Sequence, residues 1–343
     1  MQVESNAAPP DDWDAYVERH PLASAYHRAA AVGIGSAAFG LATRFLTARD
    51  AQRQLTGVLP LVEQSSLLFG RFLVSLPFFT YGGILADAPE VGVALAASAA
   101  ELARARRARH VELRHTEPLT GLTLPQRTDK VSMLLPLPDS EQALGKRLGS
   151  KLRSQIKRAE REEPEIIWGG SELIPQFYDV FATTMHEVGT PVYPRSFFEA
   201  TCRALHGLLW IVVVRAKGQV EAAAILVRHG KRIEVPWAAA TQAGKRGALN
   251  MRLYWELLLH SIRVGAEVFD FGRSSHDSGT YRFKAQWGAQ PLQLHWHYWL
   301  PADQKLPQLN QSNPKYALAA SIWKRLPLWC ANALGPHIVK NLP

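Results

Sequence analysis

Apolar and polar residues alternate along several short stretches of the second half of the chain. This two-residue period, together with short apolar runs between turn residues, predicts strands at 131–137, 165–168, 209–215, 220–229, 232–239, 267–271 and 292–300. A four-residue period at Leu144, Leu148, Leu152 and Ile156 predicts one continuous amphipathic helix over 140–161. Further helices are predicted over 174–186, 195–205 and 249–264.

The first half has the same mixture of patterns. Strands are predicted at 44–47, 55–62, 71–76 and 110–114, and helices at 13–20, 25–34 and 91–107. The first ten residues, with Pro9 and Pro10, have the composition of a loose tail. Strands that alternate with helices in both halves predict an α/β fold, with the strand at 292–300 closing the second sheet.

Length and composition narrow the class of protein. A chain of 343 residues suits two domains, and 47% hydrophobic against 20% charged residues indicates a globular protein. The run at 91–100 is too short to span a bilayer, and Asp11 and Asp12 stand where a signal peptide would be basic. Two isolated cysteines, Cys202 and Cys330, predict neither a disulfide framework nor a metal site, so we expect a cytoplasmic protein.

The formal net charge of +9 favours anionic partners. Nucleotide cofactors, tRNA, acidic lipid headgroups and anionic saccharide precursors all fit this charge, which does not choose among them. Two histidines, His295 and His297, face one side of the predicted strand at 292–300. Without a nearby carboxylate or cysteine in the sequence, they indicate a polar strand face, and we expect no metal.

The segment 269–288 is the most informative part of the sequence. It begins as a short apolar strand, breaks at Gly272, continues as a polar loop and ends in an aromatic and basic stretch. Lys284 lies between Phe283 and Ala285, so its ammonium is expected to project from a partly apolar wall. A cation in such a place can stabilise negative charge that develops during a reaction.

The stretch FDFGRSS…GTYRFKAQWG resembles the closing signature of the FemAB-like acyltransferases, especially the FemAB-related proteins that accompany PEP-CTERM/exosortase systems. Three other stretches resemble the same family: GVLPLVEQSSLLFGRFLVSLPFFTYGG at 57–83, SKLRSQIKRAER at 150–161 and GTPVYPRSFF at 189–198. The resemblance implies two GNAT-like domains, each a mixed sheet flanked by helices, that share a central cleft. The expected domains are 11–130, 131–300 with the signature, and a helical tail at 301–343 that packs back on the first domain.

The resemblance also implies roles for residues of the signature. The family's Phe-Lys pair before an aromatic-Gly pair corresponds to Phe283, Lys284, Trp287 and Gly288. In the family this lysine is taken to stabilise the tetrahedral intermediate, which is the role expected of Lys284; the alternative is a lysine that snorkels beside Trp287. His276 and Asp277 are candidates for accepting the proton of the amine, or are plain surface residues. The expected substrate contacts are Tyr193, Arg195, Trp237, Arg273, Ser274, Tyr281, Phe283 and Trp287.

Two basic regions are candidates for binding anions. The loop at 241–249 precedes a predicted helix, and its expected contacts to the acyl donor are Gly244, Lys245, Arg246, Gly247 and, on the helix, Asn250. An ordinary turn would have the same composition. The helix over 140–161 carries the positive charges of Lys146, Arg147, Lys151, Arg153, Lys157, Arg158 and Arg161. We interpret this face as a surface for a polyanion, such as a tRNA acceptor arm, a phosphate-bearing substrate or a membrane; the alternative is a solvated face.

The function predicted from these features is transfer of an activated acyl or aminoacyl group onto an amine of a cell-envelope or exopolysaccharide-related acceptor. The donor is either an aminoacyl-tRNA or a thioester of coenzyme A or acyl carrier protein, with no permanently bound cofactor. The alternatives are a thioester-dependent N-acyl amino acid synthase and a non-catalytic binding protein for an anionic envelope precursor. The tail around Trp323 and Trp329 is expected to dock on the first domain or to contact the inner membrane surface.

Overall fold

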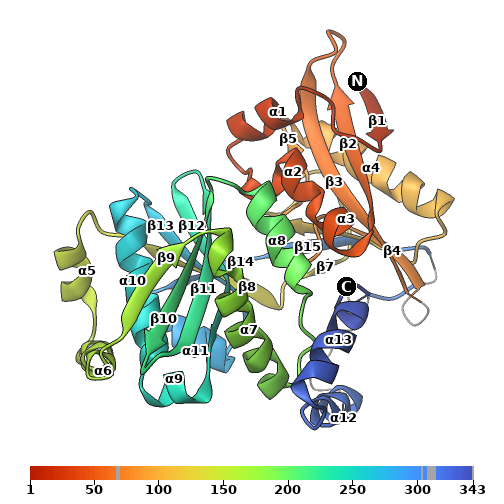
Figure 1. Ribbon diagram of the computed structural model, residues 1–343. Helices are drawn as coiled ribbons and strands as arrows, with labels where there is room; N and C mark the ends of the chain where they lie inside the picture. The colour runs from red at the N-terminus through yellow and green to blue at the C-terminus, as the bar shows by residue number, and fades with distance from the viewer. Residues whose placement is uncertain (67–69, 303, 307–313, 342–343) are drawn as a thin grey trace. The chain divides into compact units, whose positions relative to one another are not determined.

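The computed structural model describes residues 1–66, 70–302, 304–306 and 314–341, with only the backbone at 314–317. The chain divides into two compact units, coloured by residue number in Figure 1. The first unit comprises 1–131, 293–309 and 340–343, and the second comprises 132–292 and 310–339. Each contains one sheet with helices packed on it, which confirms the predicted α/β architecture.

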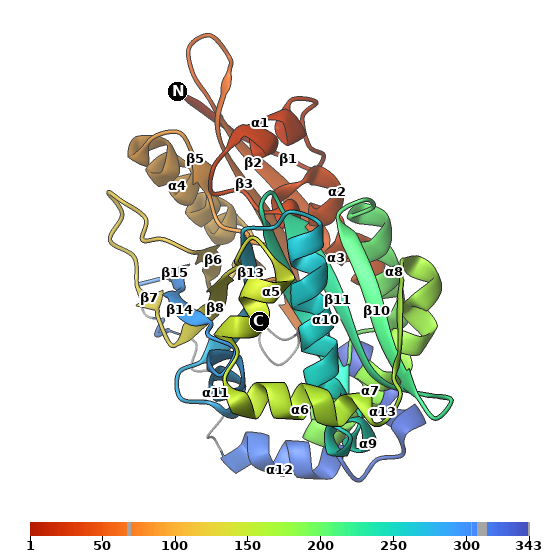
Figure 2. The same ribbon diagram turned by 90° about the vertical axis from the view of Figure 1, so that its left-hand side faces the viewer.

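The sheet of the first unit has the strand order β1-β2-β3-β4-β6-β15-β7, with β5 paired to β3. The strands are β1 (Gln2–Asn6), β2 (Ala42–Arg49), β3 (Leu55–Ser66), β4 (Gly70–Val74), β5 (Leu85–Ala86), β6 (Val111–His115), β7 (Gln126–Arg127) and β15 (His295–Trp299). The helices are α1 (Trp13–Arg19), α2 (Ala29–Val32), α3 (Ile34–Phe39) and α4 (Pro89–Ala105). Figure 2 shows α4 on one side of the sheet and α1 to α3 on the other.

Helix α4 is held by small and branched residues at helical spacing. Leu95, Ala99 and Ala103 are fully buried and belong to one core cluster with Leu46 and Leu59 of the sheet. Strands β4 and β6 run parallel, with Val74 opposite Glu112. Since α4 lies between these two strands in the sequence, β4-α4-β6 is a βαβ crossover.

The sheet of the second unit has the order β14-β8-β13-β12-β11-β10-β9. Its strands are β8 (Lys130–Pro136), β9 (Glu165–Gly169), β10 (Leu209–Ala216), β11 (Gln219–His229), β12 (Arg232–Ala240), β13 (Val268–Ser275) and β14 (Gln290–Gln293). Its helices are α5 (Glu141–Arg147), α6 (Ser150–Glu160), α7 (Ile174–Val188), α8 (Arg195–Ala204), α9 (Gln242–Arg246), α10 (Leu249–Arg263), α11 (Gly279–Ala285), α12 (Pro314–Trp323) and α13 (Leu328–Val339). Figure 1 shows α10 on one face of the sheet and α7 on the other.

The helix predicted over 140–161 is broken into α5 and α6. Leu148 has an extended backbone with ψ near 133°, and Gly149 is the N-cap of α6. Glycine is a poor helix former and Ser150 favours a helix start, so the chain turns here. Leu144, Leu148, Leu152 and Ile156 are nevertheless all buried, because both short helices keep their apolar side toward the core.

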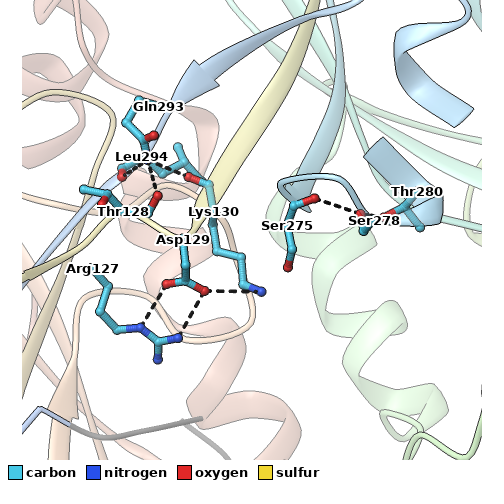
Figure 3. A network of polar contacts seen from close by, with 9 residues as sticks. All are labelled: Arg127, Thr128, Asp129, Lys130, Ser275, Ser278, Thr280, Gln293 and Leu294. Carbon is cyan, nitrogen blue, oxygen red and sulfur yellow. Dashed lines mark hydrogen bonds and ion pairs between the residues drawn. The ribbon is translucent and has the colours of Figure 1, made fainter. Parts of the chain in front are cut away.

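Two predicted segments differ from the structure. Residues 2–6 are not a loose tail but form β1, which pairs antiparallel with β2 through backbone hydrogen bonds that a hydrophobic pattern does not reveal. The single strand predicted at 292–300 is divided: β14 belongs to the second sheet and β15 pairs with β6 and β7 in the first. At this passage the side-chain amide of Gln293 donates to the carbonyl oxygens of Thr128 and Lys130 at 2.8 and 2.9 Å (Figure 3).

The C-terminal tail was expected to pack on the first domain. The structure groups residues 310–339 with the second unit, where α13 contacts α7, and places β1 and β15 in the first unit. The expected domain boundaries at 11–130 and 131–300 remain a prediction.

Candidate functional site

The parallel strands β12 and β13 separate toward their carboxyl ends. Their residues pair at Arg232 with Val268, at Ile233 with Phe269 and at Glu234 with Asp270. Both strands then continue to Ala240 and Ser275 without further pairing to each other in the described residues. Backbone groups beyond the last pair therefore do not bond between these two strands, and the ends of diverging parallel strands are a usual place for a ligand in an α/β sheet.

Helix α11 follows β13 directly, where the sequence predicted a polar loop. Ser278 caps the helix by accepting a hydrogen bond from the Tyr281 N–H at 3.1 Å. The Ser278 hydroxyl also lies 2.8 Å from the Ser275 carbonyl oxygen, to which it donates, and 2.9 Å from the Thr280 hydroxyl (Figure 3). This serine-rich turn fixes the direction in which α11 leaves the strand and so positions Lys284.

Lys284 is buried, with 8% of its surface exposed. Its Nζ donates hydrogen bonds of 2.9 Å to the carbonyl oxygens of Gly272 and Arg273, which lie on the part of β13 beyond the last pair. Gly272 has a φ of +73°, a left-handed conformation that suits glycine and turns its carbonyl out of the regular ladder. The lysine therefore does not project into solvent but is fixed at the diverging strand ends.

Burial lowers the pKa of Lys284 to about 8, because the charged form loses its hydration. The Asp270 and Glu234 carboxylates oppose this shift, and the Arg273 guanidinium adds to it. Glu234 and Asp270 are 1% and 0% exposed and stand opposite each other on β12 and β13. Two buried carboxylates thus accompany a lysine that remains largely protonated near neutral pH.

Each of these carboxylates has further partners. Asp270 Oδ1 accepts hydrogen bonds from the Ser132 hydroxyl at 2.7 Å and from the Gly272 N–H at 2.8 Å. Glu234 Oε2 lies 2.9 Å from His229 Nε2, and burial lowers the pKa of His229 to about 3, so a neutral imidazole donates this bond. We call Ser132, His229, Glu234, Asp270 and Lys284 the buried polar cluster.

Two buried donors near Lys284 have no hydrogen-bond partner within the described residues. They are the Ser274 hydroxyl, on a residue 5% exposed, and the Trp287 indole Nε1, on a residue 3% exposed. Ser274 directly follows the Arg273 carbonyl that Lys284 binds, and Trp287 follows α11. Buried donors without partners are costly, so these two groups are suited to meet a ligand or water.

An aromatic wall lies beside the lysine. The Tyr254 ring of α10 packs 5.6 Å from Phe271, 4.9 Å from Phe283 and 6.2 Å from Trp287. Burial raises the pKa of Tyr254, so its phenol stays neutral. The expected substrate contacts Phe283 and Trp287 thus form one surface with Tyr254, which the sequence analysis did not single out.

The other signature residues lie at the surface of the turn. His276, Asp277 and Arg273 are exposed, and Tyr281 is half-buried with its ring 6.0 Å from that of His276. Asp277 has a φ of +55°, and its carbonyl accepts a hydrogen bond from Arg282 at 2.9 Å. The structure therefore puts the two candidate bases on an exposed turn, separate from the buried polar cluster.

The three expected contacts from the middle of the chain have structural partners. Tyr193 stacks on Phe197 at 4.7 Å, and Arg195 Nε donates to Glu199 on the next helical turn at 3.1 Å. Trp237 is 6% exposed and packs edge-on against Phe197 and Phe198. Tyr193 and Trp237 thus pack against helix α8, while Arg195 remains exposed.

The loop expected to bind the acyl donor contains a short helix, α9, capped by Thr241, whose hydroxyl accepts from the Gly244 N–H at 3.0 Å. A Cβ on Gly244 would lie 2.5 Å from the Glu221 carbonyl oxygen, so this glycine is required by close packing against β11. Lys245 and Arg246 are exposed, Gly247 and Asn250 are half-buried, and Asn250 donates to the Met251 sulfur at 3.6 Å.

The basic side chains of α5 and α6 all point outward. Exposed positions are Lys146, Arg147, Lys151, Arg153, Lys157, Arg158 and Arg161. Arg158 donates to the backbone carbonyl of Arg246, which joins α6 to α9. We call the seven residues with Lys245 and Arg246 the basic surface.

The histidines of β15 lie in the first unit. His297 Nδ1 is 3.3 Å from His115 Nδ1, and burial lowers the pKa of His115 to about 3. Within the described part of the chain, no group of three or more His, Cys, Asp or Glu side chains could hold a metal ion.

No helix among the described residues is long and apolar enough to cross a membrane.

Comparison with known proteins identifies the domain type. Residues 146–285 match the family of the acetyltransferase (GNAT) domain. No curated protein sequence matches the chain.

The solved structures with the same fold span nearly the whole chain. The crystal structure of FemX is 15% identical, covers 92% of this chain and 100% of its own, and superposes with a TM-score of 0.65. L-PGS from Bacillus licheniformis is 13% identical over 94% of this chain and 99% of its own, with a TM-score of 0.56. A tandem GNAT protein from the clavulanic acid biosynthesis pathway is 14% identical over 89% of this chain and 100% of its own, with a TM-score of 0.53. Residues 146–285 therefore match the acetyltransferase (GNAT) domain, and the whole chain has the fold of FemX and of the tandem GNAT protein, which is the fold that the resemblance to the FemAB-like family predicted.

Proposed function

We propose that this GNAT protein transfers an activated acyl or aminoacyl group onto an amine of a cell-envelope or exopolysaccharide-related acceptor. The observation that carries the proposal is Lys284, a buried cation fixed by two backbone carbonyls where β12 and β13 diverge. Two of its N–H groups point to carbonyls, which leaves one for a reacting oxygen. The Ser274 and Trp287 donors, which have no partner among the residues that the structure describes, are suited to bind the same ligand.

In the proposed step, the neutral amine nitrogen attacks the ester or thioester carbonyl carbon, and the carbonyl oxygen gains negative charge. Lys284 stabilises this oxyanion from a site that is already desolvated and oriented, so little reorganisation is needed. The C–N bond forms, the bond to the leaving oxygen or sulfur breaks, and the nitrogen gives up one proton. His276 and Asp277 are the proposed acceptors of that proton, directly or through water, because both are exposed to solvent at the adjoining turn.

The donor is an aminoacyl-tRNA or an acyl thioester. The basic surface suits either one, because the phosphates of a tRNA or of a thioester carrier can bind to its cations. FemX and L-PGS share the fold, as does a tandem GNAT protein that is described without AcCoA, which is a thioester of the kind proposed here. For a tRNA, the basic surface offers nine exposed cations on or next to the short helices α5, α6 and α9. A link to PEP-CTERM/exosortase systems and a peptidoglycan or exopolysaccharide acceptor remain predictions from the sequence signature.

The test begins with a donor screen that compares aminoacyl-tRNA with acyl thioesters at several amine acceptors. With the active pair, Lys284→Met should lower turnover on the order of a hundredfold or more, as loss of an oxyanion donor does. Lys284→Arg keeps the charge and is the matched control. Near-normal turnover in a folded Lys284→Met variant would remove this lysine from the mechanism.

The same screen separates the alternatives. Sensitivity to ribonuclease indicates an aminoacyl-tRNA donor, while insensitivity with thiol release indicates thioester-dependent N-acylation. Lys151→Glu/Lys157→Glu should weaken tRNA binding and reduce its salt dependence, because two phosphate contacts are lost. Ligand binding with no turnover for any donor would support a non-catalytic binding protein.

A further inference from the structure

The two C-terminal helices of the second unit expose an unusual amount of apolar surface. Among the described residues, most of the large hydrophobic side chains that are exposed belong to these helices: Leu318, Ile322, Leu328, Trp329, Leu334 and Ile338. Trp329 is 73% exposed, Leu318 is 63% and Ile322 is 56%. Isolated exposed apolar residues are ordinary, but a concentration of them marks a contact surface.

The exposed residues occur at helical spacing. Leu318 and Ile322 are four residues apart, and so are Leu334 and Ile338, so each pair lies along one side of its helix. The buried side of α13 is formed instead by Ala331, Gly335 and Val339. Each helix therefore has one side that packs on the protein and another apolar side that does not.

The helices are held in the second unit by close contacts with the chain around the end of α7. A Cβ on Gly189 would lie 2.8 Å from the Ala320 carbonyl, and one on Gly335 would lie 2.8 Å from the Val192 carbonyl. His186 Nε2 lies 2.9 Å from the Leu326 carbonyl oxygen between the two helices. Figure 1 shows α12 and α13 beside α7. Because the packed side is fixed, the exposed apolar side is a defined surface.

The charged side chains of the C-terminal segment are all positive. Residues 304–343 contain no Asp or Glu, and their cations are Lys305, Lys315, Lys324, Arg325 and Lys340. Lys324 and Arg325 are exposed at the end of α12, five and four residues before Trp329. Tryptophan, aliphatic residues and cations together, without carboxylates, are the composition of segments that lie in the interface of an anionic bilayer.

We propose that α12 and α13 form a docking surface for an anionic phospholipid bilayer. Leu318, Ile322 and Trp329 enter the headgroup and upper acyl region, and Lys324 and Arg325 bind the lipid phosphates. The absence of carboxylates from residues 304–343 favours this occupant over a second copy of the chain, whose matching surface would bring like charges together. The inference depends on these helices alone and not on the transfer reaction.

Cosedimentation of the full chain with vesicles tests the proposal. Vesicles of phosphatidylcholine with about 30% phosphatidylglycerol should bind at least tenfold more protein than pure phosphatidylcholine, and added salt should reduce the difference. Ile322→Ser/Trp329→Ser should lower binding to anionic vesicles by about tenfold or more, because the apolar area that enters the bilayer is lost. Lys324→Glu/Arg325→Glu should remove the preference for anionic lipid.

Two control variants isolate the surface. Leu22→Ser removes an apolar side chain that is 47% exposed in the first unit and should leave vesicle binding unchanged. Lys151→Glu/Lys157→Glu reverses the same number of exposed charges on α6, and it should lower binding to anionic vesicles much less than Lys324→Glu/Arg325→Glu does. Equal effects of Leu22→Ser and Ile322→Ser/Trp329→Ser would overturn the proposal. So would a dimer, seen by sedimentation velocity, that the latter variant dissociates while vesicles stay unbound.

Discussion

The two units place a buried carboxylate at the same point of their sheets but surround it differently. In each sheet a parallel pair ends at a carboxylate on the later strand: Glu112 opposite Val74 in the first unit, and Asp270 opposite Glu234 in the second. Glu112 receives Arg114 Nε at 2.6 Å and the Tyr298 hydroxyl at 2.8 Å. The corresponding cation of the second unit is a lysine on a helix that follows the strand.

The two buried cations, Arg114 and Lys284, differ in their surroundings. Arg114 also donates to the Phe79 carbonyl at 2.7 Å and lies 4.3 Å from the ring centre of Trp296, so its planar group is enclosed. Burial alone would raise the pKa of Glu112, but the Arg114 charge and the Tyr298 hydrogen bond outweigh it and lower that pKa. Lys284 instead has a pKa near 8, and the nearby Ser274 hydroxyl and Trp287 indole N–H have no partner in the described part of the chain. The cation of the first unit thus belongs to a buried ion pair, while that of the second unit is a lysine with a lowered pKa that is bound to two backbone carbonyls.

The largest expected effect is a difference in the free energy of unfolding when each buried cation is replaced. Arg114→Met leaves Glu112 buried without its cation and should lower the free energy of unfolding by about 3–5 kcal/mol. Lys284→Met removes a buried ammonium and leaves Asp270 bonded to Ser132 and Gly272, so its stability should change by about 1 kcal/mol or less. Urea unfolding, with hydrogen exchange read separately in β6 and β13, measures both.

The double variant Arg114→Met/Glu112→Gln is the control for this comparison. It removes both charges and should recover much of the lost stability, because no unpaired charge stays buried. Equal destabilisation by Arg114→Met and Lys284→Met would mean that both cations are structural and would contradict the distinction between the units.

The second expected effect is a rise of stability with pH that depends on Lys284. The folded pKa of Lys284 is about 8, below the ordinary value of 10.5, so between these values the unfolded chain binds more protons than the folded one. Stability therefore rises with pH through this window, by up to about 3 kcal/mol from this group. The difference in unfolding free energy between wild type and Lys284→Met should grow accordingly from pH 8 to pH 10.5, and a constant difference would contradict the burial-induced shift.

Much of the fold was predictable because strands and helices leave a periodic trace. The alternation at 220–229 and 232–239 found β11 and β12, and the spacing of Leu95, Ala99 and Ala103 fits α4 against its sheet. The break at Gly149 and the edge strand β1 were missed, since the first depends on one glycine and the second on backbone pairing. The alternation at 292–300 also cannot reveal that β14 and β15 join different sheets.

The surroundings of Lys284 were predictable only in part. The resemblance singled out Lys284, Phe283 and Trp287, which lie together with Tyr254. Ser132 and Glu234 carry no motif, because they come near Lys284 and Asp270 only through the strand register. The one sequence signal for Glu234 is a carboxylate between Ile233 and Val235 in an apolar strand, which predicts a buried charge with a partner.

The third expected effect compares two hydroxyl groups that each donate to a buried carboxylate. Tyr298→Phe removes the bond to Glu112 and Ser132→Ala removes the 2.7 Å bond to Asp270, and each should cost about 1.5–3 kcal/mol of stability. Only Ser132→Ala should also lower turnover, by severalfold, because Asp270 lies beside Lys284. Urea unfolding and steady-state rates of the two variants measure this, and an equal loss of turnover in Tyr298→Phe would contradict it.

The smallest expected effect concerns the charge state of Lys284 itself. The Asp270 carboxylate raises the pKa of Lys284 against the effect of burial, so Asp270→Asn should lower that pKa by on the order of one unit. If the protonated lysine stabilises the oxyanion, turnover falls above pH 8 in the wild type, and this alkaline limb should move to lower pH in Asp270→Asn.

Glu112→Gln is the matched control, because it removes the equivalent carboxylate of the first unit. It should reduce stability but leave the alkaline limb in place, whereas Lys284→Arg should move the limb beyond the measured range, since arginine stays charged. A pH–rate profile distinguishes these outcomes in a way that a stability measurement cannot, because a merely structural Asp270 would lower stability without moving the limb. If the alkaline limb does not move in a folded Asp270→Asn variant, Asp270 contributes only to stability, as Glu112 does in the first unit.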